Sequence, residues 1–360
     1  MKIAIIGAGI FGCTSALKLR EKFPSSKITI YEKSTSILSG ASGINQFRLH
    51  RGYHYPRSTE MIQSTIEFES EFKSCIVKGE RYYAIAKEGS LVTSEEYLNF
   101  LENNALKYWK IEGNNLPLHY TNLDLVVKVQ ESSFDPAQLY LELTKRLTDS
   151  FIILLKNTTF KKKDLKKFDL VINATYSNLN EILDDEDQLE YQFELCEKAV
   201  ISVGKDWQNI GMVIMDGEFC CIDPLGFNKY FHVLGHVKEA IHDRQVGFKY
   251  KIPPGYSDIL NIGSCKSSLS RFPFILNGCK EFFKFENKPV IPESSKGSNK
   301  LIGGVHYHGS MFTVRTVLKD RDHDDARPSY ITKHSDSLYS IFSGKIGTSI
   351  AIANQLKEMI

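Results

Sequence analysis

The sequence predicts an α/β protein that begins with a parallel sheet flanked by helices and continues with antiparallel strands. Three observations support this. The chain opens with a short apolar strand, a glycine-rich turn and an amphipathic helix. A second strand, ending in an acidic residue, follows closely. The middle of the chain holds segments rich in Tyr, Phe, Val and Ile between turn residues, which is typical of antiparallel strands; these are residues 80–91, 198–204, 217–226 and 229–237.

The opening segment has the strand–turn–helix context of a Rossmann-like dinucleotide-binding motif. Residues 3–6 (IAII) read as a buried strand, and a G-x-G-x-x-G sequence follows at residues 7–12. Gly7 permits a tight turn, Gly9 allows a pyrophosphate to approach the backbone, and Gly12 allows close packing of helix on strand. The amino terminus of that helix offers free N–H groups and a partial positive charge to phosphates.

The second strand, residues 27–32, ends in Glu32. A carboxylate at this position accepts hydrogen bonds from both ribose hydroxyls of a dinucleotide. It therefore favours NAD, or the AMP half of FAD, over the phosphorylated ribose of NADP.

Residues 33–58 favour FAD over NAD, because NAD-binding domains usually enter a helix after the second strand and this stretch is polar, glycine-containing and without helical periodicity. The segment SGASG (39–43) resembles the second phosphate and ribityl contact of the D-amino acid oxidase superfamily of flavoenzymes. LHRGYHY (49–55) is similar to the L-H-x-G-x-x-Y stretch of its 2-hydroxyglutarate oxidase and glycerol-3-phosphate dehydrogenase branches. In those branches the histidine lies beside the flavin ring.

Three later segments resemble the same superfamily. Residues 132–147 are similar to its helix after the first substrate-domain excursion, with Asp135 as N-cap and Pro136 as first helical residue. Residues 168–180 resemble its D-x-V-I-N-A-T-G strand and turn, with Tyr176 in place of the glycine. We expect either a different turn there or a strained backbone. Residues 341–360 resemble its carboxy-terminal glycine turn and helix.

The resemblance implies an FAD-binding Rossmann-like domain of the glutathione-reductase type and a discontinuous antiparallel-sheet substrate domain. The expected FAD-binding domain comprises residues 1–75, 133–180 and 325–360, and the substrate domain comprises 76–132 and 181–324. The expected cofactor is FAD, held by Gly7, Gly9, Ile10, Phe11, Gly12, Glu32, Lys33, Ser39, Ala41, Ser42, Asn45, Gln46, Leu49, Ala174, Thr175, Gly344, Lys345, Ile346, Gly347 and Thr348.

The carboxy-terminal turn also has a physical rationale. A reduced flavin carries negative charge near N1 and C2=O, which a lysine before a helix amino terminus stabilises. Lys345, Gly347 and the N–H of Thr348 fit that role. The alternative is an ordinary surface lysine before an amphipathic helix.

The segment RLHRGYHY (48–55) supplies the first catalytic candidates. In an extended chain Arg48 and His50 share one face, and an imidazole near a flavin can act as a base. Covalent attachment of the flavin to His50 or His54 is an alternative role, and some of these side chains are expected to be structural.

Residues 311–331 resemble the family stretch G-L-R-P-x-T-P-D, whose arginine commonly binds a substrate carboxylate. Arg315 falls on that arginine, although Thr316 replaces the proline. A guanidinium binds a carboxylate in a bidentate manner. Arg327 is a second candidate, and a structural salt bridge is the main alternative for Arg315.

Composition narrows the function further. The formal net charge of the 360-residue chain is only +2, so no nucleic-acid partner is expected. No apolar run reaches the ~18 residues of a membrane span. Seven scattered cysteines indicate reduced thiols and a cytoplasmic location. His306 and His308 lack the ligand spacing of a metal site, and none is expected.

The sequence therefore predicts an FAD-dependent oxidoreductase that takes a hydride from a CH–NH carbon of a small amine or amino-acid-like substrate, with a carboxylate nearby. The electron acceptor is oxygen or another compound. An FAD-dependent 2-hydroxy acid or polyol dehydrogenase is the alternative. A flavin-binding protein that works within a complex and an NAD-dependent dehydrogenase also remain open.

Overall fold

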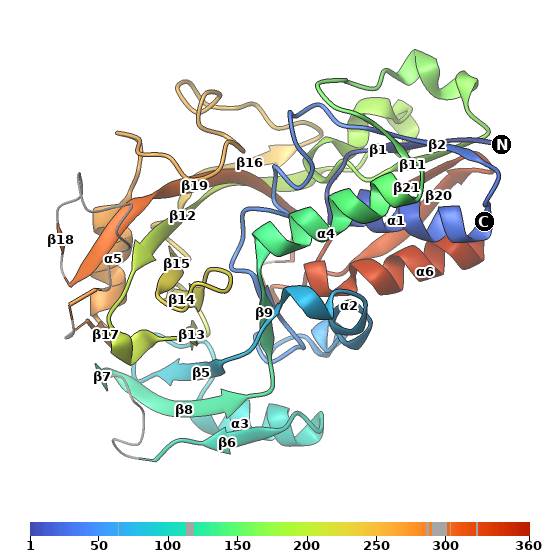
Figure 1. Cartoon of the computed structure of the whole chain (residues 1–360). Coiled ribbons are helices and arrows are strands. Elements are labelled where there is room, and N and C mark those ends of the chain that lie inside the picture. Colours follow the sequence, from blue (N-terminus) through green and yellow to red (C-terminus); the bar gives the residue numbers. More distant parts are fainter. Residues whose placement is uncertain (64, 113–118, 286–287, 290–300, 303, 322) are drawn as a thin grey trace.

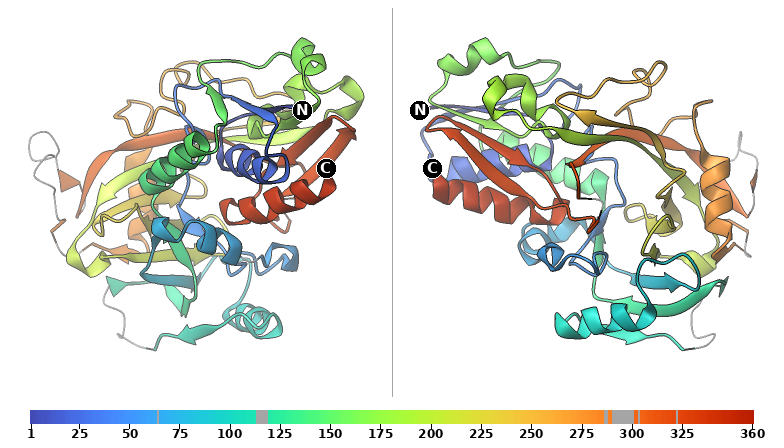
Figure 2. Two further views of the ribbon diagram at one scale, coloured as in Figure 1. Left: turned by 45° about the vertical axis from the view of Figure 1, so that its right-hand side comes forward. Right: turned by 180° about the vertical axis from the view of Figure 1, so that it is seen from behind.

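The computed structural model describes residues 1–63, 65–112, 119–285, 288–289, 301–302, 304–321 and 323–360. Two large sheets dominate it, one mostly parallel and one mostly antiparallel (Figure 1). The views in Figure 2 place the antiparallel sheet on the opposite side of the molecule from β1, β2 and α1. The predicted α/β fold class is confirmed.

The parallel sheet has the strand order β10-β2-β1-β11-β21-β20. Its first five strands run parallel, and β20 is antiparallel to β21. The chain moves outward from β1 through β2 and later returns on the other side of β1 as β11, so the strand order reverses between β1 and β11. The bounds are β1 Lys2–Ile6, β2 Lys27–Tyr31, β10 Ile153–Leu155, β11 Leu170–Asn173, β20 Tyr330–Ser335 and β21 Leu338–Phe342.

Alternation along β1 explains why this sheet is covered on both faces. Ile3 and Ile5 pack in one cluster with helices α1, α4 and α6, and Ala4 and Ile6 pack in another, which includes Phe160. The helices comprise α1 Ile10–Lys22, α4 Pro136–Asp149 and α6 Ser349–Met359. The predicted cap of α4 is confirmed, because the Asp135 carboxylate accepts from the N–H groups of Ala137 and Gln138 at 2.8 and 2.9 Å.

The second sheet has the order β18-β19-β12-β15-β14-β13-β5-β8-β6, with β16 also paired to β12. All four segments that the composition predicts as strands lie in it. Helices α3 Ser94–Asn103 and α5 Phe272–Lys280 pack on it. The strand bounds are β5 Glu80–Ala86, β6 Tyr108–Lys110, β8 Leu123–Val129, β12 Tyr191–Ser202, β13 Ile210–Met215, β14 Cys220–Pro224, β15 Phe231–His236, β16 Ile241–Gly247, β18 Leu301–Ile302 and β19 Val305–Leu318.

The two sheets share one hydrophobic core. Val200 of β12, Val233 of β15 and Met311 of β19 belong to the same buried cluster as Phe47 and the strands of the parallel sheet.

The smaller elements include a sheet of order β3-β9-β4, whose strands are Arg48–Leu49, Ser132–Phe134 and Ile76–Val77. The shorter elements are α2 Ile66–Glu71, β7 His119–Tyr120, β17 Phe283–Lys284 and the 3-10 helices η1 Thr59–Met61, η2 Lys73–Cys75, η3 Lys162–Lys167, η4 Tyr176–Ile182, η5 Asp185–Asp187, η6 Lys205–Trp207 and η8 Ile346–Thr348.

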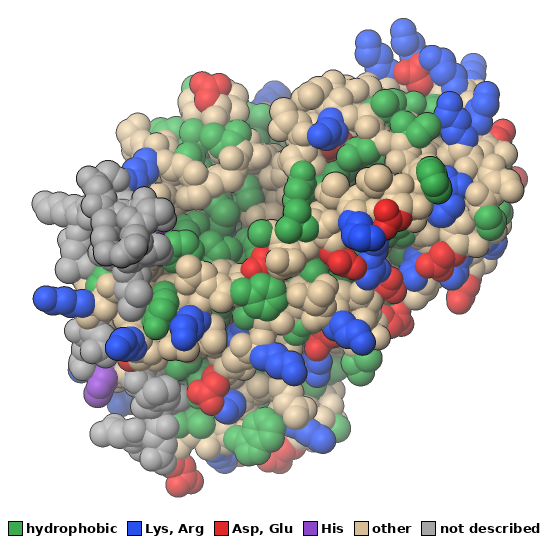
Figure 3. All heavy atoms as spheres, viewed as in Figure 1, with side chains coloured by type: hydrophobic (Ala, Val, Ile, Leu, Met, Phe, Trp, Pro, Cys, Tyr) green, Lys and Arg blue, Asp and Glu red, His purple; other side chains and the backbone are tan. Residues whose placement is uncertain are grey.

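The basic run around η3 is solvent-exposed. Lys and Arg side chains gather over this part of the molecule, at the upper right of Figure 3. Lys162 and Lys167 of this run pair with Asp184 and Asp164. Among the described helices, none has the length and apolar character needed to cross a membrane.

Candidate active site

The glycine turn after β1 meets the carboxyl end of β11. Gly7 has φ +94°, and a Cβ at that position would lie 2.7 Å from the Ala174 carbonyl oxygen. A Cβ on Gly12 would lie 2.0 Å from the Gly7 carbonyl oxygen. Helix α1 begins at Ile10 without a side-chain cap and without an acidic residue in its first turn. The N-cap residue, Gly9, supplies no capping side chain, so the first turn has room for the phosphates of a dinucleotide.

Ser42 and Glu32 flank this turn. The Ser42 hydroxyl oxygen accepts a hydrogen bond from the Ile10 N–H at 3.0 Å. The hydroxyl proton can therefore be donated to a phosphate oxygen at this place. The Glu32 carboxylate accepts from the N–H groups of Ala8 and Ser34, each at 2.7 Å. Each carboxylate oxygen keeps a lone pair for a ribose hydroxyl. Lys33, next along the chain, donates to Asn178 Oδ1 at 3.0 Å, so its ammonium faces the segment after β11.

The loop that follows is held by its own polar side chains. Asn45 donates to the carbonyl oxygens of Ala41 and Ser42 at 2.9 and 3.1 Å, and Ser39 donates to Ser36 at 2.6 Å. Gln46 reaches the antiparallel sheet, where its amide lies 2.8 Å from Cys221 Sγ and 3.3 Å from Asp223. This loop therefore connects the two sheets beside the glycine turn.

The turn after β11 keeps the conformation that a glycine would supply. Tyr176 has φ +57°, which costs roughly 1–2 kcal/mol for a residue with a Cβ. Thr175 donates to Asn173 Oδ1 at 2.7 Å, and the Asn173 amide donates to the Leu179 carbonyl oxygen at 2.8 Å. These bonds brace the strained turn. Of the two expectations for this position, the structure has the strained backbone.

The carboxy-terminal turn lies at the end of β21. Close packing requires its glycines, since a Cβ on Gly344 would lie 2.0 Å from the Arg327 carbonyl oxygen and one on Gly347 would lie 2.6 Å from a Thr65 methyl carbon. The expected N–H of Thr348 is not free, because it donates to the Lys345 carbonyl oxygen at 3.0 Å. In the structure, the one-turn helix η8 uses this N–H before α6 begins.

Lys345 stands out electrostatically. Its ammonium lies 4.6 Å from the centre of the Tyr55 ring, and no carboxylate pairs with it in the described part of the chain. Burial lowers the pKa of Lys345 to about 7. An unpaired, desolvated ammonium attracts an anion. Lys345 therefore fits the negative charge that a reduced flavin carries near N1 and C2=O.

His50 and His54 lie next to Lys345, with ring centres 5.3 Å apart. Burial, and then Lys345, lowers the pKa of His54 to about 3 and that of His50 well below its ordinary value. Both imidazoles are therefore neutral at pH 7. His50 Nδ1 lies 3.0 Å from the hydroxyl oxygen of Tyr83.

Arg48 lies in a buried network beside His50, with its guanidinium carbon 4.6 Å from the centre of the Tyr83 ring. Its side chain is fully buried, with Nε 3.0 Å from Glu131 and Nη1 3.7 Å from Asp223. Arg81 lies nearby, so two cations face two carboxylates and the charges balance. The expected contact between Arg48 and a substrate does not fit this burial.

Arg315 also has a carboxylate partner. It lies opposite Glu194 in the β12–β19 register, and its Nε donates to Glu194 Oε2 at 2.6 Å. Its side chain keeps 32% of its surface exposed, and Nη1 takes no part in these contacts. Arg327, the second candidate, pairs through Nε and Nη2 with Asp325.

Sequence reasoning missed Tyr83, Glu131 and Asp223. They come from β5, the β8–β9 turn and β14, which are far apart in the chain. No local motif marks them. Glu131 and Asp223 lie near the charged segment at residues 48–55 only after the strands have paired, so the sequence alone does not show this proximity.

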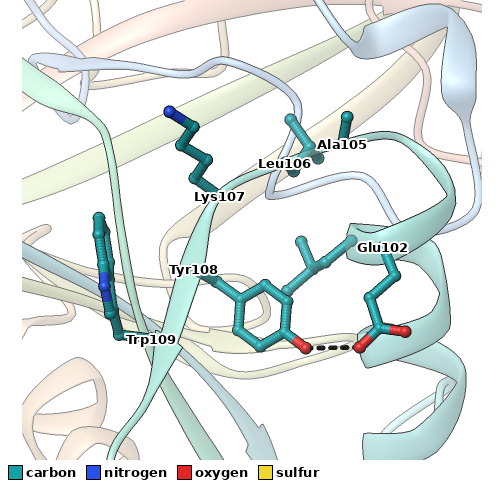
Figure 4. A pocket seen from close by; sticks show the side chains of 7 residues that line it. Glu102, Ala105, Leu106, Lys107, Tyr108 and Trp109 are labelled. Atoms are coloured by element: carbon teal, nitrogen blue, oxygen red, sulfur yellow. Dashed lines mark hydrogen bonds between the residues drawn. The ribbon is translucent and has the colours of Figure 1, made fainter.

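The depression between α3 and β6 and the pair His306 and His308 do not form a second candidate site. A depression of about 420 Å³ between α3 and β6 is lined by residues 101–102 and 105–109, and the Tyr108 hydroxyl donates to Glu102 Oε1 at 2.8 Å there (Figure 4). His306 and His308 contact each other at 3.2 Å. Over the residues described, no group of three or more His, Cys, Asp or Glu side chains is arranged to hold a metal.

Comparison with known proteins identifies the class. Residues 2–116 match the model of the DAO family, described as FAD-dependent oxidoreductases. The FAD-dependent monooxygenase FPY4 of Fusarium mangiferae is 27% identical over 191 residues, which is 49% of this chain and 50% of that protein. D-aspartate oxidase 2 of Caenorhabditis briggsae is 38% identical over 61 residues, 16% of this chain and 18% of that protein. The chain thus spans about half the length of the first of these relatives.

Solved structures agree in fold. Glycine oxidase from Geobacillus kaustophilus superposes with a TM-score of 0.70 at 13% identity, covering 99% of this chain and 94% of that one. L-proline dehydrogenase from P. horikoshii gives 0.67 at 12%, covering 99% and 92%. The family model covers the first third of the chain, and the solved structures agree with nearly the whole chain in fold. Both findings support the predicted resemblance to the FAD-dependent oxidoreductases, with the enzyme class and the FAD cofactor that it implies.

Proposed function

We propose that the protein oxidises a small CH–NH substrate, an amine or amino-acid-like compound that carries a carboxylate. The observation that carries this proposal is the meeting of a dinucleotide cradle, a desolvated ammonium and a neutral imidazole at the carboxyl ends of β1, β11 and β21. FAD, when bound, supplies the hydride acceptor. The similarity to glycine oxidase and L-proline dehydrogenase supports the substrate class.

The chain's own residues divide the work. The turn at residues 7–12 and Ser42 hold the pyrophosphate, and Glu32 holds the ribose. Lys345 lies where it can offset negative charge on the reduced flavin ring. His50 holds or accepts a proton near the substrate. Arg48 has a structural role, because Glu131 and Asp223 already occupy its guanidinium.

We retain Arg315 as the carboxylate anchor through its Nη1 edge. The variant Arg315→Gln should raise the substrate concentration needed for half-maximal flavin reduction by about tenfold or more and change the limiting rate little. Arg244→Gln is the matched control, because Arg244 also contacts Glu194, at 3.1 Å, from β16. Equal effects of both variants would show that Arg315 acts only through Glu194.

The first test is an absorbance spectrum of the purified protein before and after acid precipitation. Flavin colour that moves to the supernatant supports non-covalent FAD, and colour in the pellet indicates attachment, with His50 and His54 as candidates. Amines and 2-hydroxy acids are then compared anaerobically for bleaching of the flavin. A protein that stays colourless after FAD is added contradicts the proposal.

Oxidation of a CH–OH substrate, a 2-hydroxy acid or polyol, is the second candidate. The neutral His50 imidazole favours it, because an alcohol must lose its O–H proton to be oxidised. Bleaching by hydroxy acids and not by amines would establish it. Peroxide release in air would identify oxygen as an acceptor, whereas turnover only with an added dye would point to another acceptor.

Two further proposals complete the description. The FAD-binding domain comprises residues 1–75, 133–180 and 325–360, supported by the membership of β1, β11 and β21 in one sheet. The remaining residues form the substrate domain. A reducing, cytoplasmic location is supported by seven cysteines, all of them free thiols.

A further inference from the structure

We propose that Tyr83 and Glu131 are positioning residues that fix the tautomer of His50, so that its Nε2 atom is the proton acceptor of the site. This inference rests on the proposed function for the direction of proton transfer. The hydrogen-bond geometry itself is independent of any substrate.

The three side chains form one chain of contacts. His50 Nδ1 lies 3.0 Å from the hydroxyl oxygen of Tyr83, and this hydroxyl donates to Glu131 Oε2 at 2.9 Å. Tyr83 is completely buried and Glu131 nearly so. Solvent therefore does not replace either contact, and each hydrogen bond must be accounted for within the protein.

The direction of these bonds follows from counting protons. Glu131 accepts two hydrogen bonds, from the Tyr83 hydroxyl at 2.9 Å and from the Arg51 N–H at 2.8 Å, and the Arg48 guanidinium forms an ion pair with it, with Nε 3.0 Å from Oε2. A carboxyl group surrounded only by donors is in its acceptor form, the carboxylate. The single Tyr83 proton is committed to Glu131, so the Tyr83 oxygen can only accept from His50.

His50 must therefore carry its hydrogen on Nδ1. In a neutral imidazole the other nitrogen then holds a lone pair. The charged and titratable groups around His50 are Lys345 from the turn before α6, Arg327 before β20, His54 beyond β3, Arg48 within β3, and Tyr83 of β5. The cations among them oppose protonation of His50, and burial acts in the same direction.

The arrangement also stabilises the product of proton transfer. When the substrate's N–H or O–H proton passes to Nε2, the imidazolium keeps its Nδ1–H bond to Tyr83. Tyr83 in turn remains hydrogen-bonded to the Glu131 carboxylate. The negative charge of Glu131 therefore compensates the positive charge of the His50 imidazolium through the intervening Tyr83 hydroxyl. Burial raises the pKa of Glu131, and the Arg48 guanidinium beside it acts in the opposite direction and favours the carboxylate.

The first experiment measures the tautomer directly, without turnover. Full-length protein labelled with ¹⁵N-histidine is examined by long-range ¹H–¹⁵N NMR at pH 7.5, and His50→Asn identifies the signals of His50 among the ten histidines. We expect a protonated Nδ1 and an unprotonated Nε2. A protonated Nε2 in the wild type overturns the proposal, whether or not any variant folds.

Tyr83→Phe should abolish the preference for Nδ1–H. The matched control is Tyr53→Phe, because the Tyr53 ring stacks on Tyr83 with centres 6.1 Å apart but its hydroxyl donates elsewhere, to the Lys107 carbonyl oxygen at 2.8 Å. We expect the control to leave the His50 signals unchanged. Identical spectra for wild type and Tyr83→Phe, or equal changes in both variants, contradict the positioning role.

A second readout uses anaerobic flavin reduction over pH 5–9. His50→Asn should lower the limiting rate by about 10²-fold or more, and Tyr83→Phe by about tenfold with little change in substrate affinity. The acid limb of the rate profile should shift in Tyr83→Phe and not in Tyr53→Phe. If the expected tautomer is found but no substrate reduces the flavin, the proposed function fails and the geometric inference stands.

Discussion

At the residue scale, the buried Arg48 has carboxylate partners, whereas Lys345 has no carboxylate partner among the described residues. Arg48 and Arg81 face Glu131 and Asp223 in the interior, so each charge has a counter-charge. Lys345 has none in the described part of the chain, which is why it is the natural anion site.

The Arg48 network predicts a large stability effect. Arg48→Met leaves two buried carboxylates facing one remaining cation, Arg81, and we expect the free energy of unfolding to fall by about 3–5 kcal/mol. Urea denaturation measures this. Lys145→Met, which breaks the exposed pair with Asp149, is the control and should leave the free energy of unfolding nearly unchanged. Similar losses in the two variants would contradict a network role for Arg48.

Lys345 predicts a pH effect in the flavin-free protein. Its pKa is about 7 in the folded state and 10.5 in the unfolded state. Between these values the unfolded state binds more protons, so stability should rise with pH from about 7 to 10. In Lys345→Met this rise should shrink, the melting temperature at pH 7 should increase, and FAD affinity should fall. Lys357→Met on α6 is the control, and equal slopes in Lys345→Met and wild type would contradict the assignment.

At the element scale, the β1–α1 turn is the least tolerant part of the cofactor cradle. Gly12→Ala places a Cβ where the Gly7 carbonyl oxygen lies 2.0 Å away, so the turn must open. We expect a loss of about 2–4 kcal/mol in stability and loss of FAD binding, measured by denaturation and by absorbance. Gly247→Ala in β16 is the control, because its Cβ would meet nothing within 4 Å. Retained flavin in Gly12→Ala would contradict this role of the turn.

Strained residues lie around the same cradle. Leu38, Phe47 and Tyr176 have φ values of +58°, +57° and +57°. Each costs roughly 1–2 kcal/mol against a right-handed conformation. They persist because the shared core and the bonds of Asn45 and Asn173 hold the loops in place. Positive φ also occurs at residues elsewhere in the chain, such as Ala105 and Phe151, so it is not confined to the cradle.

At the scale of the whole molecule, acid should weaken the fold. Burial lowers the pKa of His232 and His308 to about 4 and that of His54 to about 3. Their unfolded values are near 6.5, so below that pH the unfolded state binds more protons and stability falls as the pH falls. Urea midpoints measured from pH 7.5 to 4.5 should decrease steadily below about 6.5. A midpoint that stays constant over this range would contradict the burial of these imidazoles.

The sequence by itself determined the cofactor half of the molecule. The turn at residues 7–12, Glu32, the capped helix after Asp135 and the turn at residues 344–348 are local patterns, because phosphate binding, capping and close packing depend on residues adjacent in the chain. They allowed the parallel sheet, its cofactor and its family to be predicted. The antiparallel strands were predicted from composition, but not their order or register.

Only the tertiary structure decided the partners of the charged candidates. The sequence offered Arg48 as a catalytic candidate beside His50 and Arg315 as a carboxylate anchor, yet Arg48 pairs with Glu131 and Asp223, and Arg315 pairs with Glu194. These partners come from strands brought together by long-range pairing, and Coulomb attraction in a desolvated interior depends on distances of a few ångströms that no local pattern specifies. The same pairing placed Tyr83 beside His50, where a phenol oxygen selects the nitrogen that can accept a proton.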